Sequence, residues 1–232
     1  MKPSLEQRLG HRFRSPELLQ QALTHRSAGG AHNERLEFLG DGILNFVIAA
    51  ALYDLRPEAP EGELSRLRAS LVNGPSLAER ARHLGLGASL RLGGGELKSG
   101  GERRDSILAD TLEAVLGAVY LDAGFETTRE VVLALYRERL QRLPDSEALK
   151  DPKTRLQEAL QGIGRPLPEY IVVEQTGEPH LRSFRVQCRV PDSGERTEGE
   201  GRSRRRAEQH AAEQMLERVA GDLHPNRGGG HG

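Results

Sequence analysis

The 232-residue sequence has one cysteine, few aromatic residues and almost no net charge. The single cysteine, Cys188, excludes an internal disulfide framework and a zinc site built from several cysteines. Tryptophan is absent and aromatic residues make up 4% of the chain, which disfavours a surface that binds single-stranded nucleic acid by stacking its bases. Lysine and arginine (33) nearly balance aspartate and glutamate (34), so binding to a polyanion requires local clusters of basic residues.

Membrane and export signals are also lacking. No apolar run of membrane-spanning length is evident, and the first residues, Met1 to Ser4, do not begin the hydrophobic segment of a signal peptide. We therefore expect a cytoplasmic protein without a membrane partner. The length suits one large domain or two modest ones.

Three carboxylates share one side of a predicted helix that begins after Asn33 and ends near Leu55. Glu34, Glu37 and Asp41 are spaced i, i+3 and i+7, so a period of 3.6 residues per turn places them on one stripe. Carboxylates aligned in this way repel one another unless a cation or solvent relieves the repulsion. The pattern therefore fits either a metal site or a solvated acidic face. The opposite, apolar stripe is predicted to pack on a core and comprises Leu36, Leu39, Ile43, Phe46, Val47 and Ala50.

A second predicted helix carries Asp110 and Glu113 beside an apolar stripe and ends near Gly124. Gly117 lies one turn beyond Glu113, where the missing side chain lets another backbone or a ligand come close. Two such helices can pack so that four acids converge, and ligands that are all oxygen suit Mg²⁺ or Mn²⁺ rather than zinc. A carboxylate-bridged di-iron bundle needs Glu-x-x-His on its helices, and neither acidic helix contains it.

The order of predicted elements indicates two domains. Residues 1–143 are predicted to be all-α, and the proline-led polar segment 144–150 to be a linker. Residues 151–221 follow an α-β-β-β-α pattern, which predicts an α+β domain. The tail, 222–232, is predicted to be disordered, and the glycine-rich stretch 93–101 to be a mobile loop.

Two further features remain open on the residues alone. Phe38 projects from the polar side of the first acidic helix, so it is either a stray exposed ring or an interface anchor. The segment from Gly201 to Glu208 places four arginines at the start of the last predicted helix. The dipole and free N–H groups there favour phosphate, and the alternative is a solvated basic turn.

Residues 33–41 resemble the signature motif of bacterial ribonuclease III, and residues 107–121 resemble the second acidic helix of that family. The α-β-β-β-α region is similar to a double-stranded-RNA-binding domain, so the resemblance covers about residues 4–220. It implies an endonuclease that requires Mg²⁺, with Mn²⁺ as a substitute, and that cuts both strands of duplex RNA as a homodimer. The implied products carry 5′-phosphate and 3′-hydroxyl ends with two-nucleotide 3′ overhangs. The implied roles are rRNA and mRNA processing.

The resemblance also assigns catalytic residues. Glu37, Asp41, Asp110 and Glu113 match the metal ligands of the family, and Glu34 matches a further acidic position near the cleavage site. Two hard cations held by carboxylates can supply an activated water and relieve charge on the leaving oxygen. Neither acidic motif contains a histidine or lysine to act as a base. In the family, the position of Phe38 contacts the partner subunit.

In the second domain the resemblance implies three elements that contact duplex RNA through its shape and phosphates. The family's usual lysine pair is replaced by Arg204 and Arg205, and its Gly-Pro-x-His loop reads Gly-Glu-Pro-His, which keeps the charge and the histidine. A protein that holds duplex RNA without cutting it is the alternative function, but carboxylates occupy all four metal-ligand positions, which favours the enzyme. The implied RNA contacts are Lys153, Thr154, Gln157, His180, Ser203, Arg204 and Arg205.

Overall fold

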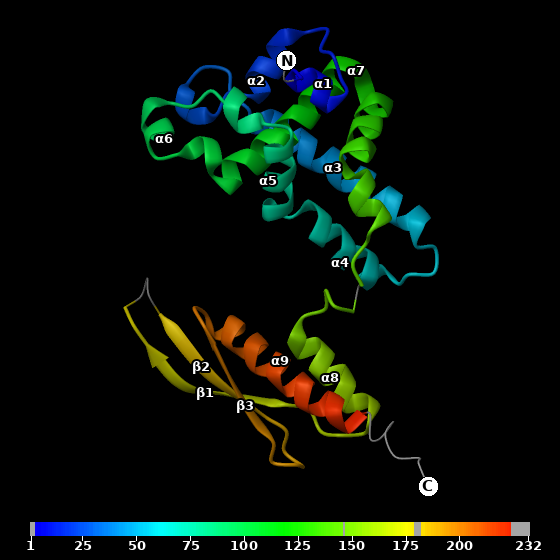
Figure 1. Ribbon diagram of the computed structural model, residues 1–232, viewed down its shortest axis with the longest axis vertical. Coiled ribbons are helices and arrows are strands. Elements are labelled where there is room, and N and C mark those ends of the chain that lie inside the picture. The colour runs from blue at the N-terminus through cyan, green and yellow to red at the C-terminus, as the bar shows by residue number, and fades with distance from the viewer. Residues whose placement is uncertain (1–2, 146, 179–181, 224–232) are drawn as a thin grey trace. The chain divides into compact units, whose positions relative to one another are not determined.

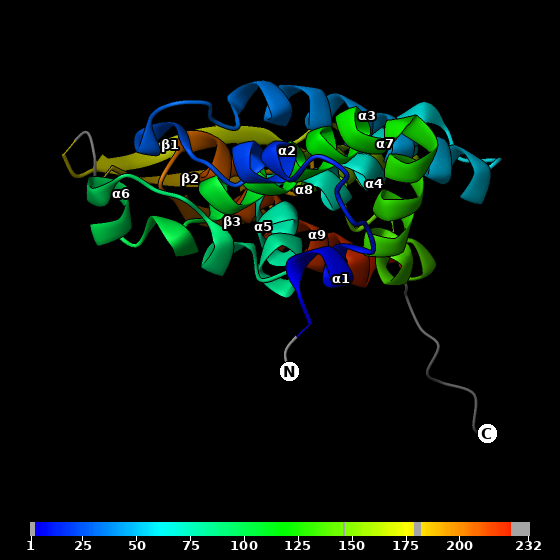
Figure 2. The same ribbon diagram turned by 90° about the horizontal axis from the view of Figure 1, so that it is seen from above.

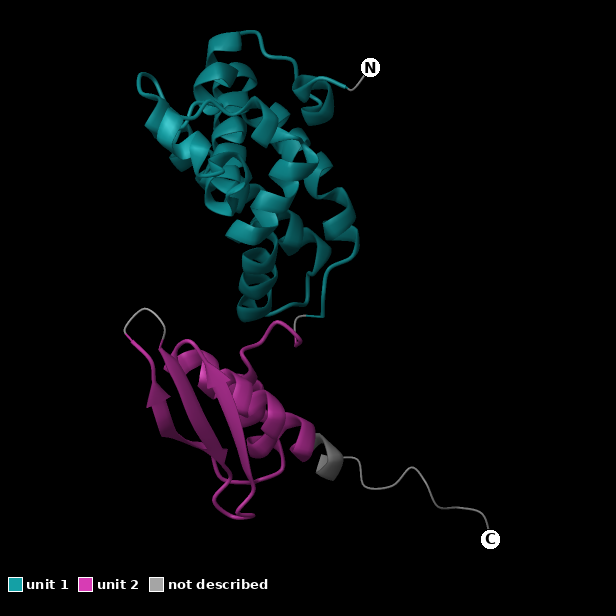
Figure 3. Cartoon of the chain, turned by 60° about the vertical axis from the view of Figure 1, so that its left-hand side comes forward, with its two compact units in different colours: residues 1–146 teal, residues 147–232 magenta. Residues whose placement is uncertain are grey.

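The computed structural model describes residues 3–145, 147–178 and 182–223. The chain divides into two compact units, Met1–Ser146 and Glu147–Gly232, shown in different colours in Figure 3. This division falls inside the segment 144–150 that we predict to be a linker. His180 and the greater part of the predicted disordered tail, 224–232, lie outside the described residues.

The first unit is built from helices over its described residues, which confirms the predicted class (Figures 1 and 2). Pro16 stands at the first position of α2, where its fixed φ and missing N–H suit a helix start. The helices are α1 (Leu5–Leu9), α2 (Pro16–Ala22), α3 (Glu34–Leu55), α4 (Glu61–Val72), α5 (Gly74–His83), α6 (Gly94–Lys98) and α7 (Asp105–Gln141), with 3-10 turns η1 (Arg26–Ala28), η2 (Leu86–Ser89) and η3 (Gly101–Arg103).

The two acidic helices, α3 and α7, pack against each other through glycine. A Cβ added at Gly40 of α3 would overlap the carbonyl oxygen of Glu113, and one added at Gly117 of α7 would overlap that of Leu36. The two backbones therefore touch at this crossing, as the sequence indicated for Gly117. Leucine and isoleucine side chains continue the contact as a fully buried core; they are Leu44, Ile48, Leu52, Leu108, Leu112 and Leu116.

The predicted apolar stripe of α3 is partly wrong. Leu36 and Val47 are buried, but Phe46 is 61% exposed and Ala50 is exposed too. The buried face is centred on Gly40 and Leu44, because the close approach of α7 at Gly40 determines which side of α3 meets the core. Phe46 instead lies against Phe125 of α7, with ring centroids 5.8 Å apart.

Helix α3 is also long and apolar enough to cross a membrane by length and composition, contrary to the expectation from the sequence. It carries Glu34, Glu37 and Asp41 in its first turns, and it packs along α7 through the buried residues of the core. We therefore assign α3 as the core helix of the first unit.

Two segments differ in detail from the sequence-based expectation. Helix α7 runs through the predicted break, but Gly124 interrupts it with φ 82° and ψ −179°, a conformation that favours glycine. The stretch 93–101, expected to be a mobile loop, forms α6 and begins η3. The N–H of Gly93 donates to the Ser27 hydroxyl at 2.9 Å, which ties this segment to η1.

The second unit is an α-β-β-β-α domain, as predicted. Its elements are α8 (Pro152–Gly162), β1 (Glu169–Thr176), β2 (Ser183–Arg189), β3 (Arg196–Gly201) and α9 (Arg204–Leu223). The strands form an antiparallel sheet in the order β1-β2-β3. Side chains alternate between the two faces of β2, so that Val186 and Cys188 are buried, and α9 packs closely on β3 at Gly199. Leu156 and Leu160 of α8 join Met215 of α9 in this core.

The glycine contacts predict that two neighbouring substitutions in α3 differ greatly in their effect on the free energy of unfolding. Gly40→Ala should lower the free energy of unfolding of the first unit by about 3 kcal/mol, because the added methyl group overlaps backbone that cannot move independently. Gly42→Ala is the matched control, since a Cβ there meets nothing within 4 Å among the described residues, apart from the adjoining backbone of α3 itself. It should raise the free energy of unfolding by up to about 1 kcal/mol, because alanine has a higher helix propensity than glycine. Denaturant unfolding of both variants checks this, and equal stability would contradict the tight crossing.

Candidate metal centre and duplex-RNA surface

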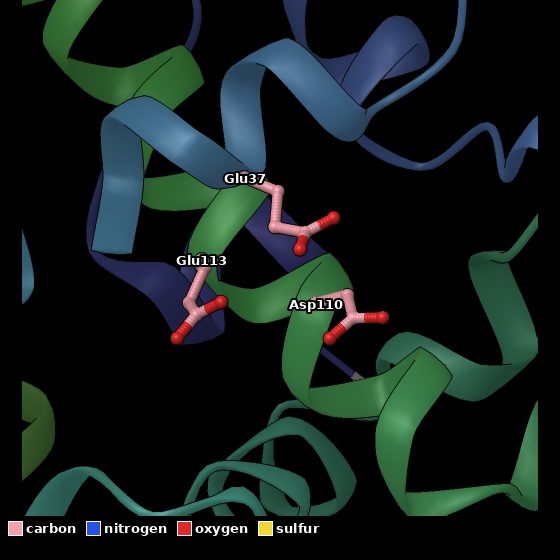
Figure 4. Close-up of side chains that lie close together, drawn as sticks. All are labelled: Glu37, Asp110 and Glu113. Carbon is pink, nitrogen blue, oxygen red and sulfur yellow. The ribbon is translucent and has the colours of Figure 1, made fainter. Parts of the chain in front are cut away.

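Three of the predicted metal ligands converge at the crossing of α3 and α7. Glu37 comes from α3, and Asp110 and Glu113 come from α7 (Figure 4). Each offers a carboxylate oxygen, and these oxygens lie within 4.8 Å of one another. The glycine-mediated approach of the two helices is the reason for this proximity, because Gly40 lies directly against the backbone of Glu113.

The carboxylates in this cluster destabilise one another's charge. Burial, together with the charges of Asp41, Asp110 and Glu37, raises the pKa of Glu113 to about 8, and burial is the largest of these causes. Burial is also the main cause of the raised pKa of Glu37, followed by the charge of Asp110. The pKa of Asp110 is raised by burial, although the charges of His25 and Arg26 oppose this shift. A cation would relieve the repulsion among all of these groups.

The other two predicted acidic residues lie outside this cluster of three. Asp41 is exposed, and its Oδ1 accepts a hydrogen bond from Asn45 Nδ2 at 2.7 Å. Its charge nevertheless contributes to the raised pKa of Glu113. Glu34 pairs with Arg26, with Nη1 and Oε1 3.2 Å apart. The roles of Asp41 and Glu34 therefore stay predictions.

The cluster fits a hard divalent cation. Its ligand atoms are all carboxylate oxygens, which Mg²⁺ and Mn²⁺ prefer. The groups are half-buried, and burial together with the neighbouring carboxylates disfavours the charged forms of Glu37 and Glu113, an effect that a bound cation would offset. Glu37, Asp110 and Glu113 would hold the ion from the positions that they already occupy.

A cleft of about 500 Å³ opens beside the cluster, and two of the metal-ligand candidates, Glu37 and Asp110, line it. Sequence reasoning missed several of its other charged residues. Arg26 and Arg104 lie in the cleft wall, together with Glu96. None of them belongs to an acidic motif, and only the folding of η1, α6 and the start of α7 around the cluster brings them together.

The predicted RNA contacts of the second unit gather where α8 and α9 begin. Glu208 joins Lys153 to Arg204: Lys153 Nζ is 2.6 Å from its Oε2, and Arg204 Nε is 2.8 Å from its Oε1. Arg205 Nη2 lies 3.6 Å from Asp151 Oδ2. The remaining predicted contacts within the described residues are exposed; they are Thr154, Gln157 and Ser203.

Comparison with known proteins agrees with both units. Residues 15–140 match the model of a ribonuclease-III-like family, and residues 152–219 match the double-stranded RNA binding motif. Ribonuclease 3 of Alkalilimnicola ehrlichii is 63% identical over 218 residues, which cover 94% of this chain and 96% of that protein. The chain belongs to the ribonuclease III family.

Solved structures support the assignment. The nuclease domain of ribonuclease III from Campylobacter jejuni is 44% identical, with a TM-score of 0.57, over 58% of this chain and 94% of that chain. That structure is described as flexible in a region involved in dimer formation. A second structure of the same nuclease domain is 43% identical, with a TM-score of 0.56, and covers 58% of this chain and 92% of that chain. This member of the ribonuclease III family is thus an endoribonuclease that acts on double-stranded RNA. Its family uses a divalent metal ion.

The basic start of α9 predicts a change in salt dependence. Replacing Arg204 and Arg205 with alanine should weaken binding to duplex RNA, and each lost phosphate contact should lower the log–log salt slope by about 0.7–0.9. Arg218→Ala is the matched control, because Arg218 lies towards the other end of α9 and donates to the carbonyl oxygen of Arg196. Binding titrations at several salt concentrations measure the slopes. If the salt slope of duplex binding is unchanged in the double variant, the arginines at the start of α9 form only a solvated basic turn.

Proposed function

We propose that this ribonuclease III-family enzyme hydrolyses both strands of duplex RNA at the α3–α7 carboxylate cluster with two Mg²⁺ ions, for which Mn²⁺ can substitute. The observation that carries the proposal is the convergence of Glu37, Asp110 and Glu113 within 4.8 Å at a cleft in the nuclease unit. Asp41, whose charge already acts on Glu113, is proposed as the fourth ligand. Glu34, at the same cleft, is proposed as a further acidic residue near the cleavage site.

The residues of the chain have separate tasks in this proposal. When bound, the cations supply an activated water and stabilise charge on the leaving oxygen. Glu37, Asp110 and Glu113 provide an oxygen-only ligand set from two helices whose other faces are buried in the core. Because the pKa of Glu113 is about 8, this carboxyl holds a proton at neutral pH until a cation displaces it.

The second unit is proposed to hold the duplex. Lys153, Arg204 and Arg205 present positive charge at the adjoining starts of α8 and α9, and Thr154, Gln157 and Ser203 lie on the same elements. His180 is included in this proposal on its sequence motif. Such a surface recognises the shape and the phosphates of a duplex, not its base sequence.

The finer properties implied by the resemblance complete the proposal. The enzyme acts in the cytoplasm as a homodimer, with Phe38 at the subunit contact. Two sites related by a two-fold axis match the two antiparallel strands of a duplex. The products carry 5′-phosphate and 3′-hydroxyl ends with two-nucleotide 3′ overhangs, and the cellular substrates are precursors of rRNA and mRNA.

Cleavage of a long, perfectly paired RNA tests the proposal. The purified protein should cut this duplex with Mg²⁺ or Mn²⁺ and leave it intact in EDTA. End-labelling of the products should reveal 5′-phosphates and two-nucleotide 3′ overhangs. Binding without cleavage in the presence of either metal would instead support a protein that only holds duplex RNA.

A further inference from the structure

Asn33 carries a buried amide group whose place in the fold no contact explains. It is the N-cap residue of α3 and is only 2% exposed. Its Nδ2 is buried and has no hydrogen-bond partner among the described residues. An amide N–H that loses water without gaining an acceptor costs stability, so such a group in a native fold indicates a role other than folding.

The Asn33 side chain does not perform the usual task of an asparagine at a helix start. An N-cap side chain normally accepts a hydrogen bond from the first helical turn, as Asn73 does from the Ser76 N–H at 3.0 Å at the start of α5. Asn33 makes no such bond, and its backbone is helical (φ −83°, ψ −15°) where capping favours an extended one. Its backbone is fixed by other contacts, since its N–H donates to Thr24 O and its carbonyl oxygen accepts from the Glu37 N–H, both at 2.9 Å. The side chain is therefore held at a defined place and is available to another partner.

The side chain one helical turn further along has the complementary deficiency. Glu37 lies four residues beyond Asn33, so the two side chains share one face of α3, and both line the cleft beside the carboxylate cluster. The Glu37 carboxylate belongs to that cluster (Figure 4), and no hydrogen bond to it occurs within the described ranges of the chain. A donor without an acceptor and an acceptor without a donor thus stand on adjacent turns of the same face.

We propose that Asn33 is a positioning residue of the metal centre, and that its Nδ2 donates a hydrogen bond to the Glu37 carboxylate when this carboxylate binds a cation. This inference deepens the proposed function and rests on it. A ligand held by a second hydrogen bond keeps its orientation and loses less rotational freedom on binding the ion. Asn33 itself contacts neither the cation nor the RNA in this arrangement.

The test uses the full-length chain with Asn33→Ala and with Asn33→Leu, which keeps the branched shape of the side chain without its donor. Asn73→Ala is the matched control, because Asn73 is also an N-cap asparagine of the nuclease unit, but its side chain caps its helix and does not line the cleft. Denaturant unfolding in EDTA should give both Asn33 variants the midpoint of the wild type, since the lost amide had no partner. The midpoint of Asn73→Ala should fall, because this variant loses its cap. An equal fall in both Asn33 variants would assign Asn33 to the fold and overturn the proposal.

Metal binding gives the decisive readout. The dissociation constant for Mn²⁺, followed by electron paramagnetic resonance of the free ion, should rise by about tenfold to a hundredfold in both Asn33 variants. It should stay unchanged in Asn73→Ala. Cleavage of a short RNA duplex by the Asn33 variants should likewise need a higher Mg²⁺ concentration to reach half of its maximal rate. The maximal rate itself should return to that of the wild type, because saturating metal offsets a weaker site by mass action, whereas a damaged fold would lower the maximal rate.

Binding to duplex RNA without metal tests the alternative partner of the amide. In EDTA the Asn33 variants should bind the duplex as tightly as the wild type does, and weaker binding would show that the amide contacts RNA and would overturn the inference. A Mn²⁺ dissociation constant equal to that of the wild type would overturn it as well. Failure of the wild type to cut would instead contradict the proposed function, and the Mn²⁺ constants would still show whether Asn33 supports the metal centre.

Discussion

Glu113→Gln is expected to abolish cleavage of duplex RNA and, in the absence of metal, to stabilise the protein above neutral pH. Glutamine keeps the size of the side chain but offers a neutral amide in place of a carboxylate at the most strongly perturbed position of the cluster. Losing one anionic ligand should weaken metal binding. The reaction barrier should then rise by several kcal/mol, because the charge stabilisation that the metal supplies is lost. We therefore expect cleavage to fall by at least about a thousandfold.

The gain in stability follows from the pKa of the same group. The pKa of Glu113 is about 8 in the folded protein against 4.5 for an unperturbed glutamate. Between these values the unfolded chain has released the proton while the folded chain still binds it. The free energy of unfolding therefore falls as pH rises from 4.5 towards 8 and levels off above 8. Glutamine does not titrate, so the variant should lack this decline.

Denaturant unfolding between pH 5 and pH 9 in EDTA measures the difference. Glu126→Gln is the control, because the Glu126 side chain is 80% exposed on the same helix and should leave the pH dependence as it is in the wild type. Mg²⁺ should restore stability at high pH in the wild type and have little effect on Glu113→Gln. If the free energy of unfolding of the wild type and of Glu113→Gln varies with pH in the same way, the electrostatic account is contradicted. Cleavage retained by Glu113→Gln would contradict the assignment of Glu113 as a metal ligand.

Helical spacing is a local property, so the sequence was sufficient to place the carboxylates on one stripe of each acidic helix, whereas the meeting of the two stripes was implied by the family resemblance. Glu37, Asp110 and Glu113 come together as expected, and the small residue at Gly117 indicated the close approach that makes this possible. The carboxylate direction of Asp41 was not predictable in this way. The helical period places Asn45 one turn from Asp41, but whether their side chains form a hydrogen bond depends on their rotamers.

The cleft arginines could not be predicted for a different reason. Arg26 and Arg104 lie far apart in the sequence, and each is held by an acid from outside the cluster, so no single spacing signals them. The dependence on tertiary packing also explains why the exposure of Phe46 was not predicted. Hydrophobic periodicity predicted a buried ring, but the crossing of α3 and α7 at Gly40 turned the buried face away from it. Local patterns thus predicted the elements, whereas tertiary packing decided which faces are buried.

The exposed face of α3 leads to the second large expected effect. Phe38 is 84% exposed, Phe46 is 61% exposed and Tyr53 is 71% exposed, and their spacing places all three on one side of the helix. We call these three residues the exposed α3 stripe. An aligned row of large apolar side chains is typical of a protein interface. The stripe extends the single contact predicted at Phe38 along the helix, and a second copy of the chain would cover it.

Phe38→Glu should therefore shift the protein from dimer to monomer. In a two-fold interface the substitution places two unpaired carboxylates in the contact at once, so the dissociation constant should rise at least about a hundredfold. Leu97→Glu is the control, since Leu97 is 57% exposed but lies on α6, away from the stripe. Sedimentation of both variants and the wild type at micromolar concentration measures the shift. A wild type that is already monomeric would refute the subunit contact.

Cleavage products give an independent measure of the same effect. Glu37, Asp110 and Glu113 all come from one chain, so a monomer keeps a complete cluster and loses only its two-fold partner. Phe38→Glu should consequently cut only one strand of a duplex at each site. The nicked product should show cut strands on a denaturing gel but migrate as intact duplex on a native gel. The dimeric wild type and Leu97→Glu should break both strands together, because a two-fold pair of sites faces both antiparallel strands. Paired breaks by a monomeric Phe38→Glu would show that one cluster cuts both strands in turn, and would contradict the need for a two-fold pair of sites.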